Sequence, residues 1–270
     1  KLGLEAKRDV LDLFTKSAGD WLDDWFESDA IKAMLGFDSI VGNFASPYTP
    51  GSAYVLLHHV FGEVNGKKGA WGHAIGGMGA ITQAMAACCK ERGVTIRTGC
   101  GVERLIVENG QASGVVLEGG ETITARRVVS NLHPELLFGT LVASDDQPDD
   151  FHARIRRYKS GSGTFRINVA LSQLPRFSVL PEPGDHLTAG IIMAPSLAYM
   201  DRAWMDARRE GWSSEPIVEM LIPSTLDDSL APAGQHVASL FCQHVAPVLP
   251  DGRSWDDHRD EVADLMIETV

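Results

Sequence analysis

The sequence has few cysteines and no long apolar run. Its 270 residues include only four cysteines, Cys88, Cys89, Cys100 and Cys242. Their spacing matches neither a zinc site nor a Cys-x-x-Cys redox pair. No apolar run approaches the roughly 20 residues of a spanning helix, and residues 1–5 lack the apolar stretch of a secretory signal. We therefore expect no metal site, no membrane span, and a cytoplasmic protein, or a mitochondrial matrix protein if the source is eukaryotic.

Basic side chains are outnumbered by acidic ones. Lysine and arginine total 24 and aspartate and glutamate total 36, which gives a formal net charge of -12. Such a charge repels phosphate backbones and anionic lipid, so it argues against nucleic acid and membrane surfaces as partners. The 44% hydrophobic content is enough for a sizeable core, and this length favours two intertwined subdomains over one small module.

Several catalytic signatures are also missing. The sequence has no Gly-x-Ser-x-Gly elbow and no phosphate-binding Gly-Lys-Ser/Thr loop. Residues 99–104 begin like a dinucleotide fingerprint, but Arg104 replaces the third glycine and a β-forming segment follows instead of a helix. Adjacent His58 and His59 would point about 100° apart on a helix, so they make no shared metal-binding face. They are interpreted as packed or surface histidines.

Helical periodicity marks two parts of the first hundred residues. Apolar side chains recur at three- and four-residue spacing over residues 10–26, and Ser28 is placed to begin a further turn. Two prolines and a glycine at 45–52 interrupt this helical layer. The pattern resumes over residues 80–92, where Gly93 is placed to end a helix that buries one face.

Strand patterns fall into two groups. The first group predicts a β-meander followed by a returning strand at 127–131. It consists of short β-forming runs at 94–98, 102–108, 111–118 and 121–125, and Asn-Gly and Gly-Gly turns separate the later runs. The second group, at 165–171, 187–193, 217–222 and 236–244, predicts another sheet, with helices beginning after Ser196 and Ser254. The last helical pattern meets no stop signal and the sequence does not begin with methionine, so we expect an incomplete chain.

A glycine-rich segment joins an extended run to the helix at 80–92. Residues 70–81 read Ala-Trp-Gly-His-Ala-Ile-Gly-Gly-Met-Gly-Ala-Ile. Glycine permits positive φ and a close approach of the backbone to a ligand, and the free N–H groups of a helix start attract negative charge. Taken alone, such a segment is more often only a turn.

Taken together, the segments resemble one family. Five segments are similar in order and spacing to the middle of phytoene-desaturase-like FAD-dependent oxidoreductases. They are residues 71–80, the following helix, Gly93-Val94-Thr95-Ile96, the meander 102–107 with 114–117, and residues 128–131. The resemblance implies an α/β (α+β) fold: the central fragment of a glutathione-reductase-type FAD-binding domain plus a mixed-sheet substrate domain with helices. The expected division is 1–70 and 144–270 for the substrate domain and 71–143 for the partial FAD-binding domain.

The resemblance also implies site residues. Val102 would lie against the adenine of FAD, and Ser130 and Asn131 would approach the cofactor from the other side. Cofactor contacts are further expected at the turn residues Gly76, Gly77, Met78 and Gly79, and substrate contacts at His73, Ile75 and Met78. The βαβ fingerprint and the closing glycine-rich segment of the family would lie outside this chain.

The implied function is hydride transfer from an apolar or amine-containing small molecule to flavin. No side chain is assigned a catalytic role, because the flavin carries the redox chemistry and a protein base is not obligatory. This fragment alone is expected to be inactive. The alternative is a non-catalytic binding or interaction module derived from such a flavoprotein. The sequence leaves open whether the chain forms a homo-oligomer.

Overall fold

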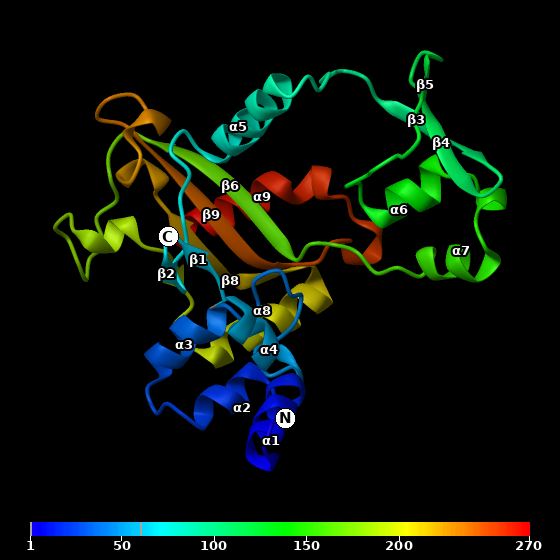
Figure 1. Ribbon diagram of the computed structural model, residues 1–270. Helices are drawn as coiled ribbons and strands as arrows, with labels where there is room; N and C mark the ends of the chain where they lie inside the picture. Colours follow the sequence, from blue (N-terminus) through cyan, green and yellow to red (C-terminus); the bar gives the residue numbers. More distant parts are fainter. Residues whose placement is uncertain (1, 60) are drawn as a thin grey trace. The chain divides into compact units, whose positions relative to one another are not determined.

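The chain divides into two compact units, which are described separately. The computed structural model describes residues 2–59 and 61–270 (Figure 1). Unit one runs to Thr82 and resumes at Gly161, and unit two comprises Gln83–Ser160. Helix α5 (Met78–Glu91) begins in unit one and ends in unit two. A mixed α/β fold of helices and small sheets confirms the expected fold class.

Four helices form the first part of unit one. They are α1 (Leu4–Thr15), α2 (Ala18–Asp23), α3 (Asp29–Phe37) and α4 (Ser52–His59). Ser17 caps α2 by accepting a hydrogen bond from the backbone N–H of Asp20. Ser28 is the N-cap residue of α3 as predicted, but its side chain makes no capping hydrogen bond. The predicted helical layer is confirmed.

A four-stranded antiparallel sheet forms the centre of unit one. Its strands are β6 (Thr164–Leu171), β7 (Ile191–Met193), β8 (Trp212–Leu221) and β9 (His236–Val245), in the order β6-β9-β8-β7. Each pairing confirms part of the predicted second sheet. Side chains on successive residues alternate between the two faces.

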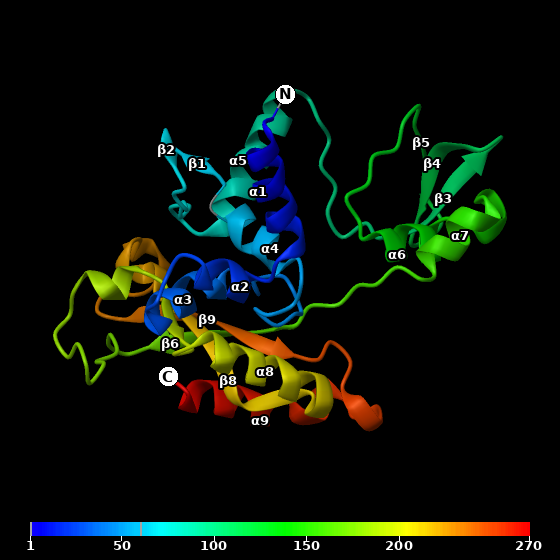
Figure 2. The same cartoon turned by 90° about the horizontal axis from the view of Figure 1, so that it is seen from below.

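Helices cover both faces of this sheet (Figure 2). Helix α9 (Trp255–Glu268) contributes Val262 and Met266 to a buried cluster with side chains of β8 and β9. On the other face, helix α8 (Leu197–Glu210) and helix α3 pack around Ile217 of β8 in a second cluster. The two clusters are the main cores of unit one. On the face that α3 and α8 cover, the β6 side chains lie outside the second cluster and closer to solvent.

Unit two contains the predicted meander. Its strands are β3 (Val102–Glu108), β4 (Gln111–Leu117) and β5 (Thr122–Thr124), paired antiparallel in the order β3-β4-β5. Asn109 and Gly110 both have positive φ, as a tight hairpin turn requires. The helical segments that follow are α6 (Pro134–Leu136), η1 (Leu137–Leu141), η2 (Ser144–Asp146) and α7 (Asp149–Ile155).

Three strand predictions were wrong. Residues 94–98 and 127–131 are not in strands, and residues 187–188 belong to the 3-10 helix η3 (Asp185–Thr188). Val94 is 50% exposed and Val129 is 94% exposed. A strand needs a partner for its backbone groups, and no strand of the described residues pairs with either segment. The β-forming composition is present, but the pairing is not.

Short elements complete the fold. A two-residue hairpin joins β1 (Glu63–Val64) to β2 (Lys67–Lys68), and further 3-10 turns are η4 (Pro223–Thr225), η5 (Asp228–Leu230) and η6 (Pro250–Gly252). Among the described residues, every helix is too short or too polar to cross a membrane.

Candidate functional site

The predicted glycine turn is held by a buried carboxylate. Gly76 and Gly77 have φ of +83° and +79°, a region that favours glycine. The Gly76 backbone N–H donates a 2.6 Å hydrogen bond to the Asp227 carboxylate. This pair is separated by 151 residues in the sequence. The turn is therefore a fixed structure in unit one and not a loose linker.

Asp227 is itself held in place from its own loop. Its second carboxylate oxygen accepts hydrogen bonds from the Ser229 backbone N–H and hydroxyl at 3.0 and 2.6 Å. The hydrogen bond from the Ser229 side chain, followed by that from Gly76, lowers the pKa of Asp227. The carboxylate is thus ionised under neutral conditions and can orient the turn. Asp227 is a site residue that the sequence did not predict.

The side chains around the turn face solvent. Ile75 is 70% exposed and Met78 is 79% exposed. His73 is also exposed, and it lies near enough to Asp227 to contribute to the lowered pKa of that carboxyl group. A side-chain carbon at Gly79 would meet no atom within 4 Å. The turn therefore presents an open, mainly apolar surface beside accessible backbone.

Val102 begins an outer strand of unit two. It pairs with Leu117 of β4, and β3 has no partner on its other side among the described strands. The register shifts between Val102 and Arg104, so the strand is irregular at this end. An outer strand carries backbone N–H and C=O groups that are free to bind a planar polar ring.

Ser130 and Asn131 lie in exposed, irregular backbone of unit two. The Ser130 hydroxyl accepts a 3.2 Å hydrogen bond from the Leu132 backbone N–H. Their predicted position at the end of a strand is wrong, because no strand forms there. The polar groups are nonetheless accessible to a ligand. The predicted roles of Val102, Ser130 and Asn131 in cofactor binding stay predictions.

A second group of polar residues lies on one face of the four-stranded sheet. The register places Arg166 of β6 opposite Phe241 of β9, and Phe241 opposite Glu219 of β8. The Arg166 guanidinium carbon is 5.4 Å from the centroid of the Phe241 ring. We call this row, together with Asp38 and Gln243, the sheet-face group. All of its members lie in unit one.

Burial shifts the pKa of two partly buried carboxyl groups there. Burial raises the pKa of Glu219, the Asp38 carboxylate raises it further, and Arg166 opposes both. Burial also raises the pKa of Asp38, against the opposing influence of His59. Among the described residues, no hydrogen bond contributes to the pKa of either carboxyl group. Both groups are therefore costly to keep ionised in the fold.

The local structure explains why these carboxyl groups are unusual. Asp38 is the C-cap residue of α3, where the negative end of the helix dipole disfavours an anion. Glu219 interrupts the otherwise apolar stretch of residues 216–222. The missing side chain of Gly190 leaves room for it, because a side-chain carbon there would lie 2.8 Å from a Glu219 carboxylate oxygen. A lone acid in an apolar strand is the signal that could have revealed this group.

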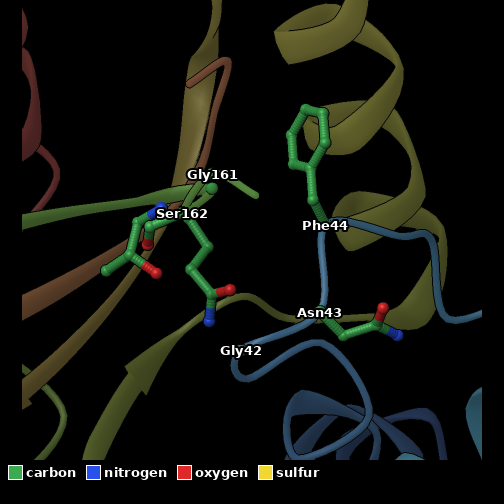
Figure 3. A pocket seen from close by; sticks show the side chains of 8 residues that line it. Gly42, Asn43, Phe44, Gly161 and Ser162 are labelled. Carbon is green, nitrogen blue, oxygen red and sulfur yellow. Dashed lines mark hydrogen bonds between the residues drawn. The ribbon is translucent and has the colours of Figure 1, made fainter. Parts of the chain in front are cut away.

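A cavity of about 310 Å³ adjoins the same sheet (Figure 3). The loop of Gly42, Asn43 and Phe44 forms one wall, and residues 161–164 with Gln243 form the other. Glycine is required at 163, because a side-chain carbon would lie 2.6 Å from the Phe44 ring. The cavity is therefore shaped by close packing of a glycine-containing loop against an aromatic ring.

Two buried polar side chains, Gln243 and His244, are neighbours at this end of β9, and Gln243 lines the cavity. Gln243 is 1% exposed and its Nε2 atom has no hydrogen-bond partner among the described residues. His244 is fully buried next to it. Burial lowers the pKa of His244 to about 4, against the opposing influence of the Ala45 backbone, so the ring is neutral at pH 7. Unsatisfied buried polar atoms are rare in native proteins, so the Gln243 donor is an unusual feature of this wall.

The four cysteines are free thiols and do not form a metal centre. Cys242 is buried in the core of unit one, and burial raises its pKa to about 12. The described residues contain no group of three potential ligands that could hold a metal ion.

Comparisons with known proteins connect these features to one family. Residues 2–173 match the family described as flavin containing amine oxidoreductase. The chain is 38% identical over 257 residues to rat pyridine nucleotide-disulfide oxidoreductase domain-containing protein 2, covering 92% of this chain and 44% of that protein. It is 30% identical over 215 residues to the all-trans-zeta-carotene desaturase of Myxococcus xanthus, covering 79% of this chain and 38% of the desaturase.

A solved structure has the same fold. The crystal structure of an oxidoreductase from Methanosarcina mazei matches 99% of this chain and 57% of that chain, with a TM-score of 0.63 and 18% identity. The chain thus spans about half the length of the proteins it resembles. The expected resemblance to phytoene-desaturase-like oxidoreductases is confirmed. Because the family match extends over more than half of its residues, this chain belongs to the flavin containing amine oxidoreductase family.

Proposed function

We propose that this chain is part of an FAD-dependent dehydrogenase or oxidase that takes hydride from an apolar or amine-containing small molecule. The family match over residues 2–173 carries the proposal, because it identifies flavin as the cofactor class. The similarity to a carotene desaturase supports oxidation of a carbon skeleton as one form of the reaction. Location in the cytoplasm or mitochondrial matrix, and a homo-oligomeric state, stay predictions.

Unit two offers groups of the kind that bind FAD. The free side of β3 at Val102 offers backbone donors and acceptors of the kind that an adenine ring pairs with. Ser130 and Asn131 add exposed polar side chains. Val129 lies in the segment 127–131, which pairs with no described strand. Its exposed side chain presents an apolar surface that a flavoprotein would cover. We propose that Val102, Ser130 and Asn131 contact the cofactor.

In unit one, the glycine turn offers backbone that a cofactor ring can approach. Positive φ at Gly76 and Gly77 and the open space at Gly79 let a flat ring approach the backbone. Asp227 fixes the turn by holding the Gly76 N–H. We propose that Gly76, Gly77, Met78 and Gly79 contact FAD, and that His73, Ile75 and Met78 line the substrate side.

The chemistry divides between cofactor and protein. Bound flavin supplies the hydride acceptor. The protein residues bind the substrate, orient its reacting carbon and exclude water, which needs no side-chain base. The exposed Ile75 and Met78 suit the last task, because apolar side chains closing over a substrate displace solvent.

Cofactor content tests this proposal directly. The protein purified from its native host is expected to show the visible absorption bands of oxidised flavin, and mass spectrometry of the released cofactor is expected to identify FAD. Anaerobic bleaching by a substrate would then establish the reaction. A protein that copurifies with no flavin, and takes none up, would instead support a non-catalytic binding module.

The glycine turn can be tested with a matched pair of variants. Gly77→Ala introduces a side chain at φ +79° in the proposed cofactor contact, and Gly66→Ala does so at the same φ in the β1–β2 hairpin. Backbone strain of about 1 kcal/mol is expected in both. We expect only Gly77→Ala to lose FAD during gel filtration. Equal FAD retention by the two variants would remove the turn from the cofactor site.

A further inference from the structure

The glycine turn and the loop that follows β8 are joined by two contacts. The Gly76 backbone N–H donates to the Asp227 carboxylate at 2.6 Å, and a side-chain carbon at Gly77 would lie 3.5 Å from Cδ2 of Leu230. Both glycines and both loop residues belong to unit one. The turn therefore rests directly on the loop of residues 227–230.

The two positive-φ glycines of this turn have no N–H group left for a ligand. The Gly76 N–H is taken by Asp227, and the Gly77 N–H donates to the Ala74 carbonyl oxygen at 2.9 Å. What these two residues offer to a ligand is thus the shape of their backbone and the electrostatic field around it.

The field at the turn comes from two opposed sources. Helix α5 begins at Met78, and the N-terminus of a helix carries about half a positive charge. Asp227 carries a full negative charge at neutral pH, because its hydrogen bonds with Ser229 and Gly76 keep its pKa below the ordinary value. It is bonded to the residue two positions before the helix begins. A full charge outweighs half a charge at a comparable distance, so the net field at the turn is negative.

A negative field has a direct consequence for a redox cofactor. Adding electrons to a group is less favourable beside an anion, so an anion lowers the midpoint potential of that group. A ring that rests on the turn would lie within roughly 10 Å of the carboxylate, about one Debye length, where salt screens the charge only in part. Neutral side-chain oxygens hold backbone N–H groups about as well as carboxylates do, so holding the turn would not by itself require a charge.

We propose that Asp227 is a positioning residue that sets the reduction potential of the bound flavin: it holds the glycine turn in place, and its charge keeps the potential low. This inference rests on the proposed contact between the turn and FAD. Asp227 touches neither the substrate nor the reacting atoms, and it transfers no proton. Its effect is that the reduced cofactor passes its electrons on more readily.

Reductive titration of the holoenzyme, expressed in its native host, tests the proposal. Asp227→Asn keeps the size of the side chain and one acceptor oxygen but removes the charge. We expect it to shift the redox equilibrium of the flavin about tenfold toward the reduced form, which raises the midpoint potential of a two-electron couple by about 30 mV. Asp228→Asn is the matched control, because it removes the same charge from the adjacent, exposed residue. Solvent screens that position, so the control should shift the equilibrium by less than about twofold.

A second variant separates the hold on the turn from the charge. Ser229 is exposed, and Ser229→Ala removes a 2.6 Å hydrogen bond to Asp227 while the charge stays in place. We expect FAD to be released about threefold faster after dilution, followed by its fluorescence, with the potential unchanged. This measurement also decides the case in which Asp227→Asn does not fold. Equal release rates in Ser229→Ala and Asp228→Asn would then overturn the proposal.

The remaining outcomes separate this inference from the proposed function. Bound flavin with equal potentials in Asp227→Asn and Asp228→Asn would overturn the inference and leave the oxidoreductase function standing. Absence of flavin from the unmodified protein would remove the proposed function, and the inference would fall with it. The visible spectrum thus reports on the function, and the potential reports on Asp227.

Discussion

The central sheet of unit one and two exposed segments of unit two treat their apolar side chains differently. In unit one, the four-stranded sheet is packed between helices, and residues such as Ile217 and Met266 are fully buried. In unit two, Met85 is 64% exposed and Val129 is 94% exposed, although both belong to segments with strong apolar patterns. An apolar pattern therefore indicates which face of a segment can be buried. Burial itself requires a second segment that packs against that face.

The largest test of this comparison is a core truncation in unit one. Ile217→Ala should lower the free energy of unfolding by about 2–5 kcal/mol, because it removes a buried side chain packed by α3 and α8 and leaves a cavity. Urea denaturation followed by tryptophan fluorescence measures the change. A loss below about 1 kcal/mol would mean that this cluster is not the core that it resembles.

An intermediate effect concerns acid stability and also belongs to unit one. The pKa of His244 falls to about 4 on folding, so the unfolded state binds more protons between that value and the ordinary value of 6.5. Stability is therefore complete above pH 6.5 and is lost as the pH falls toward 4, by about 3 kcal/mol in total.

The variant His244→Phe tests this pH dependence. Phenylalanine keeps a ring beside Phe44, whose ring is at 5.5 Å from His244 and edge-on to it, and removes the titrating group. We expect the difference in urea midpoint between pH 7 and pH 4.5 to shrink in this variant. An unchanged difference would assign the acid sensitivity of unit one to its carboxyl groups.

The smallest effect is expected on the exposed surface of unit two. Val129→Ser should change the free energy of unfolding by no more than about 0.5 kcal/mol, because the side chain is almost fully exposed. Urea denaturation of the same kind measures it. A cost comparable to that of Ile217→Ala would show that another surface buries Val129 in solution, and the contrast between the units would then disappear.

Local signals predicted the elements whose partners lie in the described chain. The Ser196 and Ser254 side chains cap α8 and α9 as expected, since a cap depends on the next few residues only. The Asn109–Gly110 turn likewise specified the β3–β4 hairpin. Residues 94–98 and 127–131 failed as strands, because strand formation depends on a neighbour that composition does not reveal.

The candidate site was predicted less completely than the fold. The glycines at 76 and 77 were identified, because positive φ leaves a trace in the sequence as glycine. Asp227 was not, since its contact with Gly76 joins residues that are far apart in the chain. Glu219 and Asp38 were missed for the same reason: only folding brings a strand residue near the end of a helix.

The outer strand β3 also bears on how the protein behaves at high concentration. An unprotected edge readily adds a strand from another molecule and so begins aggregation. Three of the seven residues of β3 are charged, Glu103, Arg104 and Glu108, and only Leu105 to Val107 form an uncharged run. Like charges brought together by stacked copies would repel. Wherever this edge is left bare, these side chains disfavour its pairing with the same edge of another copy.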